Sequence, residues 1–566
     1  MKIVSNMIIR KYKIIPALLL AVSCMVLFLA CEEDKVYPET RLFMPVLSDD
    51  LEAVDNTIIV NLARIKKATG YTIEISRDTF ETIDYTIESD TNYIVVNEEL
   101  LNGDPLFWNT LYQIRATAHA TEPEFDSKVS DLGSVRTDRF PTILNLPASY
   151  DVIDVAARVT WATENSGDPV TAIKVYAGND LKLTTPLMEF AVSTEDQESG
   201  ETFIEGLTPG TKYQVAIYSE ETLRGWVDYT TLVEDISPTA PGIHDLREAT
   251  DPQAVANEVA AAASGDIILV KRGAEFDMPT AALNKSITIR AAYGFGPKKA
   301  RLYNTNGNWN IAGGSTIDHV RFIGLELRGG DFGGTYVFNP NSADITVGEV
   351  LFENCDINTM RGIMRIRNSN VLFENLKIIN CQVDSIGDYG ILTADQDPSG
   401  TPSTTARVNH IVLQNSTFSH LRSGITSRNN SESILIEGCT FSNVVDAESS
   451  IYLFRYRGGA GNNNVLNGVT IRNSIMAMGW NRTEAATNNI RGKDGLGETP
   501  FTVVNTYGTN DWAFIAGYEI AGVPSATYAG DRGTLWVDPH GFNFNFKDSG
   551  FAGRFSAGDP RWRVKI

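Results

Sequence analysis

Arginine and tyrosine side chains recur between residues 361 and 457, and their types indicate a surface that binds anions. A guanidinium group can hold a carboxylate or sulfate through two parallel N–H···O bonds. A tyrosine ring covers a flat apolar surface while its hydroxyl stays hydrated. The residues expected to form one binding surface are Arg365, Arg367, Tyr389, Arg428, Tyr452, Arg455 and Tyr456. A polysaccharide with acidic groups offers both anions and ring faces, so it is the ligand class that this set predicts.

Two other interpretations of the same region stay open. The arginines can instead pair with nearby carboxylates such as Asp388, Asp446 and Glu448, which would make them structural. Four aspartates also supply the hard oxygen ligands that Ca²⁺ prefers, namely Asp384, Asp388, Asp395 and Asp397. A Ca²⁺ ion or a guanidinium group beside a uronate carboxylate would assist removal of the adjacent proton. A polysaccharide lyase acting by β-elimination is therefore the alternative function.

The sequence does not identify a complete catalytic set. A glycoside hydrolase needs two closely held carboxylates, and the Asn-Thr-Asp, Asp-Asp and Gly-His-Gly motifs of polygalacturonase-like enzymes do not occur between Pro241 and Ile566. The Arg-x-Pro-x-x-Arg and Trp-x-Asp-His motifs of pectate-lyase-like enzymes are missing as well. We therefore assign no catalytic residue and favour binding over catalysis.

A repeat explains how residues so far apart in the chain could meet. Segments of the form apolar-x-apolar-x-Asn/Gly-Cys/Ser-x-apolar occur at 320–327, 350–357, 376–383, 411–418, 434–441 and 469–476. One such unit cannot bury its own apolar face, so the units must stack as parallel strands. The small residues at the shared Cys/Ser position are expected in one buried column, with reduced cysteines, and they are Cys355, Cys381, Ser416, Cys439 and Ser474.

A second column follows the middle repeats. The pairs Gly362-Ile363, Gly390-Ile391, Gly424-Ile425 and Ser450-Ile451 are expected to begin the next strand of successive rungs. Counting from them places the arginines and tyrosines on one face. The segment 451–457 is expected to direct Tyr452 and Tyr456 outward.

The chain before residue 240 shows short alternating strands broken by turns, which is typical of β-sandwiches. The segment Leu207-x-Pro209-x-Thr211-x-Tyr213-x-Val215 resembles the corner between two strands of fibronectin type III domains, in which the tyrosine plugs the corner. Trp161 lies where these domains keep a core tryptophan. The preceding 47–140 segment is a more divergent match. The resemblance implies spacer or scaffold domains.

After Pro241, Pro252 opens an alanine-rich stretch expected to form a short helix with Val255 and Val259 on one face. The helix is followed by Gly265-Asp266 and an apolar strand, which resembles the opening of right-handed parallel β-helices of the pectin-lyase-like superfamily. The tail 558–563 is similar to the ends of β-helical lipoproteins encoded in bacterial glycan-utilisation clusters. This resemblance covers roughly residues 240 to 566 and implies contact with polysaccharides.

The first residues predict export and a lipid anchor. Basic residues precede an apolar run that ends at Ala30-Cys31, an order that resembles a bacterial lipoprotein signal, in which Cys31 is lipidated. Residues 32–34 are acidic and resemble the signal that directs some lipoproteins to the outer face of the outer membrane. The net charge of −22 argues against nucleic acid as a partner. We expect membrane attachment through the lipid only, and an outer-membrane glycan transporter complex is a candidate partner.

The expected fold is mainly β, with two N-terminal fibronectin type III-like sandwiches followed by a right-handed parallel β-helix. The expected divisions are a signal peptide at 1–30, a tether at 31–46, sandwiches at 47–140 and 141–240, and the β-helix at 241–566. Ca²⁺ is the one cofactor considered.

Overall fold

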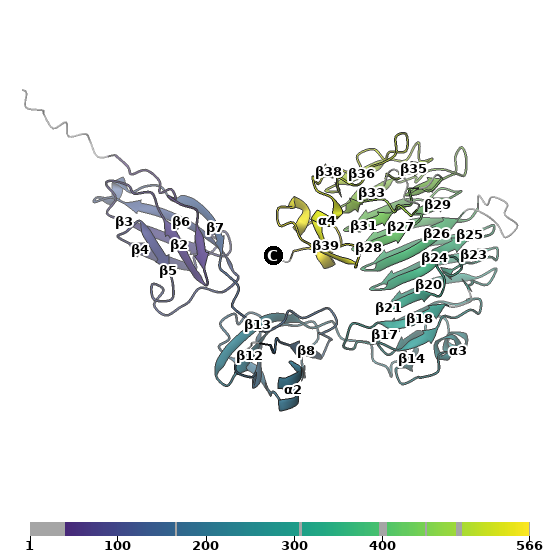
Figure 1. The fold of residues 1–566 in the computed structure, drawn as a ribbon, viewed down its shortest axis with the longest axis horizontal. Coiled ribbons are helices and arrows are strands. Elements are labelled where there is room, and N and C mark those ends of the chain that lie inside the picture. Colours follow the sequence, from purple (N-terminus) through teal and green to yellow (C-terminus); the bar gives the residue numbers. More distant parts are fainter. Residues whose placement is uncertain are drawn as a thin grey trace, which may run out of the picture. The chain divides into compact units, whose positions relative to one another are not determined.

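The computed structural model describes residues 40–164, 167–304, 308–394, 405–447, 450–482 and 489–564. These residues form a mainly β protein with large parallel sheets (Figure 1). Within these ranges, no helix combines the length and apolar character needed to cross a bilayer. Asp395, Asp397, Glu448 and the lipidation candidate Cys31 lie outside the described residues.

Residues 40–144 form an antiparallel β-sandwich. One sheet has the order β1 (Glu52–Val54), β2 (Thr57–Asn61) and β5 (Tyr93–Val96); the other has the order β4 (Tyr85–Ser89), β3 (Gly70–Ser76), β6 (Leu111–His119) and β7 (Ser130–Arg136). A short 3₁₀ turn, η1 (Pro123–Phe125), joins β6 to β7. Alternate residues of β6 are buried, as the period of two along a strand requires. Both sheets contribute to one apolar core.

The next sheets are also antiparallel. β10 (Pro186–Ala191), β9 (Ala172–Ala177), β12 (Lys212–Ser219) and β13 (Thr222–Thr230) form one sheet, and β8 (Ala156–Thr160) pairs with β11 (Glu201–Glu205), which follows α2 (Thr194–Ser199). The expected tyrosine corner is present, because the Tyr213 hydroxyl accepts the Thr208 N–H at 2.9 Å. The divergent first sandwich has the same device, in which the Tyr112 hydroxyl accepts the Phe107 N–H at 2.9 Å.

Between residues 243 and 527 the strands form two parallel sheets. The ten-stranded sheet has the order β14 (Ile243–Leu246), β15 (Ile267–Val270), β17 (Ile287–Ala291), β20 (Thr316–Ile323), β23 (Ile345–Glu353), β25 (Val371–Ile379), β27 (Arg407–Gln414), β30 (Ser433–Glu437), β33 (Val469–Arg472) and β36 (Phe501–Val504). The main path of the fifteen-stranded sheet is β16 (Glu275–Asp277), β18 (Ala300–Asn304), β21 (Leu325–Gly329), β24 (Asp356–Ile366), β26 (Gln382–Ala394), β28 (Thr417–Leu421), β31 (Thr440–Val444), β34 (Ile475–Ala477), β37 (Tyr507–Gly508) and β38 (Ala526–Thr527).

A third row of strands continues from the fifteen-stranded sheet. It contains the second halves of β24 and β26 together with β19 (Asn308–Trp309), β22 (Tyr336–Phe338), β29 (Ile425–Ser427), β32 (Phe454–Tyr456) and β35 (Lys493–Asp494). The chain visits the ten-stranded sheet, the fifteen-stranded sheet and this third row, and then begins the next rung beside the first. Figure 1 shows these strands lying side by side. The arrangement is consistent with a β-helix.

The Asn/Gly position of the repeat forms the turn between the first two sheets. Asn354, Asn380, Asn415, Gly438 and Asn473 have φ values of 53°, 55°, 50°, 62° and 52°. Glycine adopts this left-handed conformation without steric cost, and asparagine tolerates it better than most residues. The repeat therefore marks the places where the backbone must turn.

The following Cys/Ser position forms the expected buried column. The Cys381 sulfur accepts the Cys355 N–H at 3.4 Å, and the Ser416 hydroxyl accepts the Cys381 N–H at 2.9 Å. One rung further, the Ser474 hydroxyl accepts the Cys439 N–H at 3.1 Å. All five residues are buried, and Cys355, Cys381 and Cys439 are free. This prediction is confirmed.

We expect the Cys381 and Cys439 thiols to be unreactive in the folded protein. Burial raises the pKa of the Cys381 and Cys439 thiols, and the thiolate is the reactive form. Iodoacetamide followed by mass spectrometry should label them in guanidinium chloride and leave them largely unlabelled in buffer. Rapid labelling in buffer would contradict the buried column.

The second expected column is only partly correct. Gly362 pairs with Gly390 as predicted, but Ile425 pairs with Leu392 rather than with Ile391. On the next rung Ile425 pairs with Phe454, so Ser450-Ile451 lies outside the column. The segments that connect the strands differ in length from rung to rung. The number of residues between a repeat and the next strand therefore does not predict which residues pair.

A short helix covers the first rung, as predicted. α3 (Ala254–Ala261) buries Val255 and Val259 against the coil. His244 of β14 holds it in place, because its Nδ1 lies 2.5 Å from Glu258 Oε1 and its Nε2 lies 2.7 Å from Asp266 Oδ2. The hydrogen bond with Asp266, followed by that with Glu258, raises the pKa of His244 above its ordinary value of 6.5.

Replacing His244 by glutamine should therefore destabilise the protein in a pH-dependent way. A raised folded-state pKa contributes stability that is complete below the unfolded-state value and is lost as pH rises through the folded-state value. We expect a cost of about 1 kcal/mol near pH 6 that shrinks toward pH 9. Urea denaturation of both proteins at the two pH values measures it, and an equal cost at both would contradict the ion pair.

The C-terminal tail docks on the outer surface of the fifteen-stranded sheet. It contains α4 (Arg532–Leu535), β39 (Trp536–Asp538), β40 (Asn543–Phe546), η2 (Ala552–Phe555) and η3 (Pro560–Trp562). Leu535, Trp536 and Phe544 pack with Ile475 and Ala477 of β34 in one apolar cluster. The buried Asp559 accepts the Thr417 hydroxyl at 2.8 Å, and burial raises its pKa.

Candidate functional site

The third row of strands brings the predicted arginines together. Arg365 pairs with Thr393, Thr393 with Thr426, and Thr426 with Arg455, so all four share one position on successive rungs. Rungs of a parallel sheet lie about 4.8 Å apart, which places the Arg365 and Arg455 backbones roughly 14 Å apart. Both side chains are half-buried and face away from the core.

A second column of arginines lies at the end of the same row. Arg367, Arg428 and Arg457 each follow a buried residue, namely Ile366, Ser427 and Tyr456. The Arg428 N–H donates to the Ala394 carbonyl and the Arg457 N–H donates to the Ser427 carbonyl, which fixes the stacking. We call the surface formed by Arg365, Arg367, Arg428, Arg455, Arg457 and Tyr389 the arginine face.

Tyr389 is the aromatic centre of one end of this face. The guanidinium carbons of Arg365 and Arg361 lie 4.0 and 4.7 Å from its ring centroid. A side chain at Gly362 would lie 2.8 Å from the Tyr389 Cβ, so only glycine permits this packing. Among the described residues, no carboxylate lies within 4.0 Å of Arg365. Its charge is therefore available to an anionic ligand.

The other end of the face is partly neutralised. Arg455 lies 5.2 Å from the Tyr452 ring centroid, and its Nε lies 3.3 Å from Asp494 Oδ2. Tyr452 is buried and packs edge-on against Tyr518, with ring centroids 5.6 Å apart. Tyr452 is only 9% exposed, so it contributes little to a binding surface, contrary to the prediction that it points outward.

Tyr456 is a correction to the predicted set. It is 1% exposed, and its hydroxyl lies 2.7 Å from the Ser431 hydroxyl in the interior. The error follows from the displaced register at Ser450-Ile451, because Phe454 rather than Ile451 pairs with Ile425. Arg455 and Arg457, which flank Tyr456, are the residues that face outward.

Next to the arginine face, other arginines form ion pairs with carboxylates and have a structural role. Asp388 forms ion pairs with Arg361 and Arg422, at 3.6 Å for Arg361. The buried Asp446 lies 3.4 Å from Arg422 Nε and 3.7 Å from Arg482 Nη1. Asp388 and Asp446 thus pair with arginines that were not in the predicted set.

The Ca²⁺ hypothesis does not fit the two aspartates that the structure describes. Asp384 accepts the Ser385 hydroxyl at 2.7 Å and lies 2.9 Å from His420 Nδ1. Asp388 is held by two guanidinium groups, which a cation would have to displace. The described part of the chain contains no group of His, Cys, Asp or Glu side chains that could hold a metal ion.

Trp480 lies in a corner cluster with His420, Asn443, Arg482 and Arg532, four residues that the sequence analysis did not single out. Asn443 Oδ1 accepts Arg532 Nη1 at 2.5 Å, and its Nδ2 lies 3.0 Å from His420 Nε2. Because arginine only donates, Asn443 must direct its amide N–H groups to His420. His420 Nε2 is then an acceptor, and its Nδ1–H donates to Asp384.

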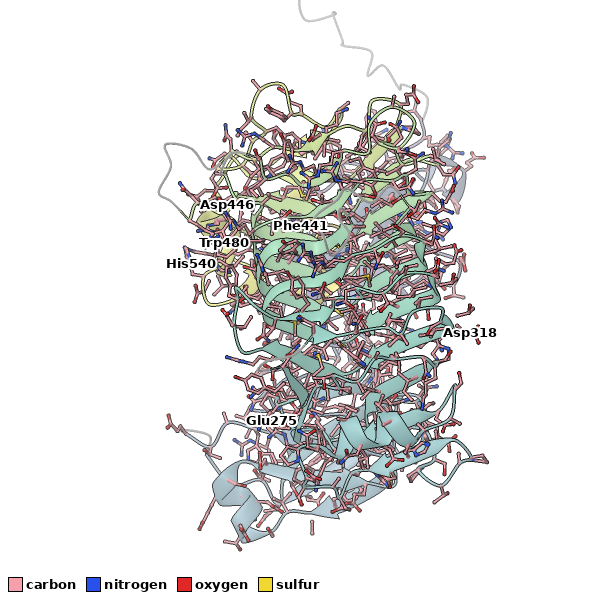
Figure 2. All side chains as sticks on the ribbon, turned by 90° about the vertical axis from the view of Figure 1, so that its right-hand side faces the viewer. Glu275, Asp318, Phe441, Asp446, Trp480 and His540 are labelled. Atoms are coloured by element: carbon pink, nitrogen blue, oxygen red, sulfur yellow. The ribbon has the colours of Figure 1, made fainter. Side chains whose placement is uncertain are left out.

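An aromatic platform completes this corner. The Trp480 ring centroid lies 5.4 Å from His420 and 5.8 Å from Phe332, and the Arg482 guanidinium carbon lies 5.2 Å from the Trp480 ring. Figure 2 shows Trp480, Asp446 and His540 gathered at one edge, with Asp318 on the opposite side. His420 and Asn443 adopt a left-handed φ, which recurs at Thr359 and Ser385, so the backbone bends at the same place on successive rungs.

The comparisons with known proteins concern the fold. No protein-family model and no curated protein matches the chain. The solved FN1–FN3 domains of chicken CNTN1 align at 15% identity with a TM-score of 0.15, covering 34% of this chain and 66% of that one. A segment of two fibronectin type III domains from chicken tenascin aligns at 16% identity with a TM-score of 0.15, covering 34% and 99%.

The chain is therefore a mainly β protein with fibronectin type III-like structural neighbours and large parallel sheets. At a TM-score of 0.15 these neighbours carry no information about the arginine face.

Proposed function

We propose that residues 241–566 form a right-handed parallel β-helix of the pectin-lyase-like class, and that its arginine face binds an acidic polysaccharide. The observation that supports this proposal is the environment of the Arg365 side chain. Its guanidinium group stacks on Tyr389 and has no carboxylate partner among the described residues, while Arg455 occupies the same position three rungs away.

Electrostatics favours an anionic ligand for this face. The protein carries a net charge of −22, so dispersed arginines would relieve its self-repulsion at least as well as clustered ones. A row of guanidinium groups beside a tyrosine ring matches the carboxylates and ring faces of an extended uronate chain. Because the side chains of this face are only half-buried, salt should weaken the interaction.

An arginine-assisted lyase is the second candidate. Such an enzyme needs a base beside the guanidinium groups, and His420 is the imidazole of the adjoining corner. Both of its ring nitrogens are engaged, by Asp384 and by Asn443. This favours binding without elimination.

Cellular context completes the proposal. A lipid at Cys31 would hold the protein on the outer surface of the outer membrane, and the sandwiches would act as spacers. Such a binding protein would deliver glycan to its partner, a glycan transporter complex in the same membrane.

The test is affinity gel electrophoresis of the chain from Glu32 onward in gels that contain polygalacturonate, alginate or chondroitin sulfate. Dextran and carboxyl-reduced polygalacturonate are the matched neutral controls. We expect retardation by at least one acidic polymer, weakened by salt and abolished by carboxyl reduction. Equal retardation by reduced and native polymer, or none by any acidic polymer, would overturn the proposal. A rise in absorbance from unsaturated uronate would identify the lyase instead.

A further inference from the structure

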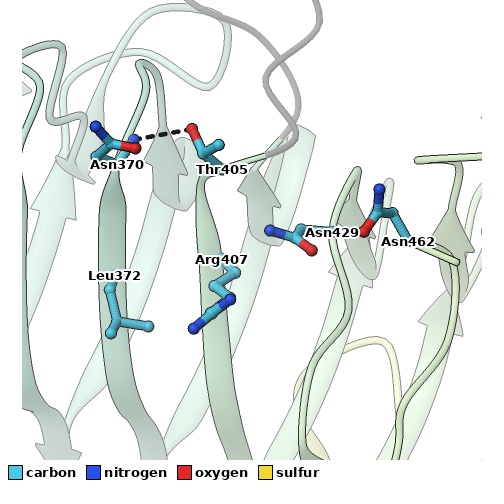
Figure 3. Close-up of a pocket in the computed structure, with 6 residues that line it drawn as sticks. All are labelled: Asn370, Leu372, Thr405, Arg407, Asn429 and Asn462. Atoms are coloured by element: carbon cyan, nitrogen blue, oxygen red, sulfur yellow. Dashed lines mark hydrogen bonds between the residues drawn. The ribbon is translucent and has the colours of Figure 1, made fainter.

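A cavity of about 490 Å³ lies near the end of the arginine face. It is lined by Asn370, Leu372, Thr405, Arg407, Asn429 and Asn462, which come from four successive rungs (Figure 3). Leu372 and Arg407 are paired neighbours on β25 and β27, and Asn429 directly follows Arg428 of the arginine face. The volume lies in the range of small-molecule sites.

The walls of the cavity are fixed by internal hydrogen bonds. The Asn370 N–H donates to the Thr405 hydroxyl at 2.9 Å, and its side-chain amide donates to Asp344 at 2.9 Å. Asn429 Oδ1 accepts the Asn430 N–H at 2.9 Å. This bond fixes the orientation of the Asn429 amide, and Figure 3 shows its nitrogen directed toward the side of Arg407.

Three donors at this cavity have no acceptor among the residues that the structure describes. In the described parts of the chain, neither Asn429 Nδ2 nor the Asn462 side-chain amide has a hydrogen-bond partner, and no carboxylate lies within 4.0 Å of Arg407. Asn429 is only 8% exposed. The amide groups of Asn429 and Asn462 and the guanidinium group of Arg407 can therefore donate to a ligand that enters the cavity.

We infer that this cavity binds a single uronate residue, at a chain end or on a side branch of the glycan. The inference rests on the proposed function. Arg407 would hold the carboxylate, and the two asparagine amides would donate to ring hydroxyls. Leu372 supplies an apolar wall for one ring face. The arginine face would then bind the extended main chain, while the cavity selects an end or a branch.

The test is saturation-transfer NMR and calorimetry with galacturonate and glucuronate, and with galactose and glucose as neutral controls. We expect the parent to bind a uronate, R407Q to lose at least about tenfold in affinity and N462A to lose several-fold. R328Q is the matched control, because Arg328 is half-buried on another sheet with only a 3.6 Å ion pair. Unfolding midpoints of all variants establish that they are folded.

The outcomes separate this inference from the proposed function. If the parent binds acidic polymer but no free uronate, the cavity inference fails and the arginine face stands. If free uronate binds and R407Q abolishes it while no polymer binds, the cavity stands and the proposed function fails. Equal losses in R407Q and R328Q, or equal binding of galactose, would overturn the cavity as a uronate site.

Discussion

A variant with Arg365 and Arg455 both replaced by glutamine is expected to bind acidic polysaccharide at least about 100-fold more weakly than the parent. Each charge-assisted hydrogen bond to a carboxylate contributes about 1.5–3 kcal/mol, and about 1.4 kcal/mol is tenfold in affinity. The two guanidinium groups share one position of the third row of strands. The dependence of affinity on salt should also become shallower.

The matched control is a double variant of Arg321 and Arg328, which removes the same charge from other strands. It should bind within about threefold of the parent, because screening limits the reach of its charges to about a Debye length. Affinity electrophoresis at several salt concentrations measures both variants. Unchanged binding by the Arg365/Arg455 variant, with a lowered unfolding midpoint, would assign these arginines to a structural ion network.

Replacing Trp536 by alanine should produce the largest loss of stability. Trp536 is 0% exposed and packs edge-on against Phe544, with ring centroids 5.0 Å apart. Truncating a buried tryptophan costs about 3–5 kcal/mol because a cavity remains. Differential scanning calorimetry should show the transition of the parallel-sheet region shifting downward while that of the first sandwich stays in place.

Trp536→Phe is the control that separates packing from hydrogen bonding. The Trp536 Nε1 has no hydrogen-bond partner in the described structure, so phenylalanine removes volume and no hydrogen bond. We expect W536F to lose clearly less stability than W536A. A loss under about 1 kcal/mol in W536A would show that the tail contributes little to the stability of the sheet beneath it, and equal losses in the two variants would contradict the cavity as the cause.

The features that could be predicted from the sequence are those that recur along the chain and depend only on neighbouring residues. The Asn/Gly turn and the Cys/Ser column could be found because one backbone conformation and one small buried site recur in five successive rungs. The second column failed at Gly424 and Ser450, because its register depends on connecting segments of different length. Tyr456 was misplaced for the same reason.

Other features had no local signal at all. Asn443 meets Arg532 across 89 residues, and Thr417 meets Asp559 across 142 residues. The tail docks on side chains that point outward from the strands. The repeat is defined by the apolar side chains that point inward, so it gives no information about this docking surface. The Trp480 corner and the cavity beside Arg407 likewise arise from segments brought together only by folding.

The common position of Arg365 and Arg455 has a consequence for selectivity. Hydrogen-bonded rungs fix the separation of the two backbone positions, and each guanidinium group lies against a tyrosine ring, which limits how far it can move. A ligand gains from both at once only when two of its anionic groups can reach that separation, and the second contact then forms at high effective concentration. A polymer of the same total charge with its anions at unsuitable intervals would gain from only one. Charge spacing along the glycan, rather than charge density, should therefore decide which acidic polymers are retained.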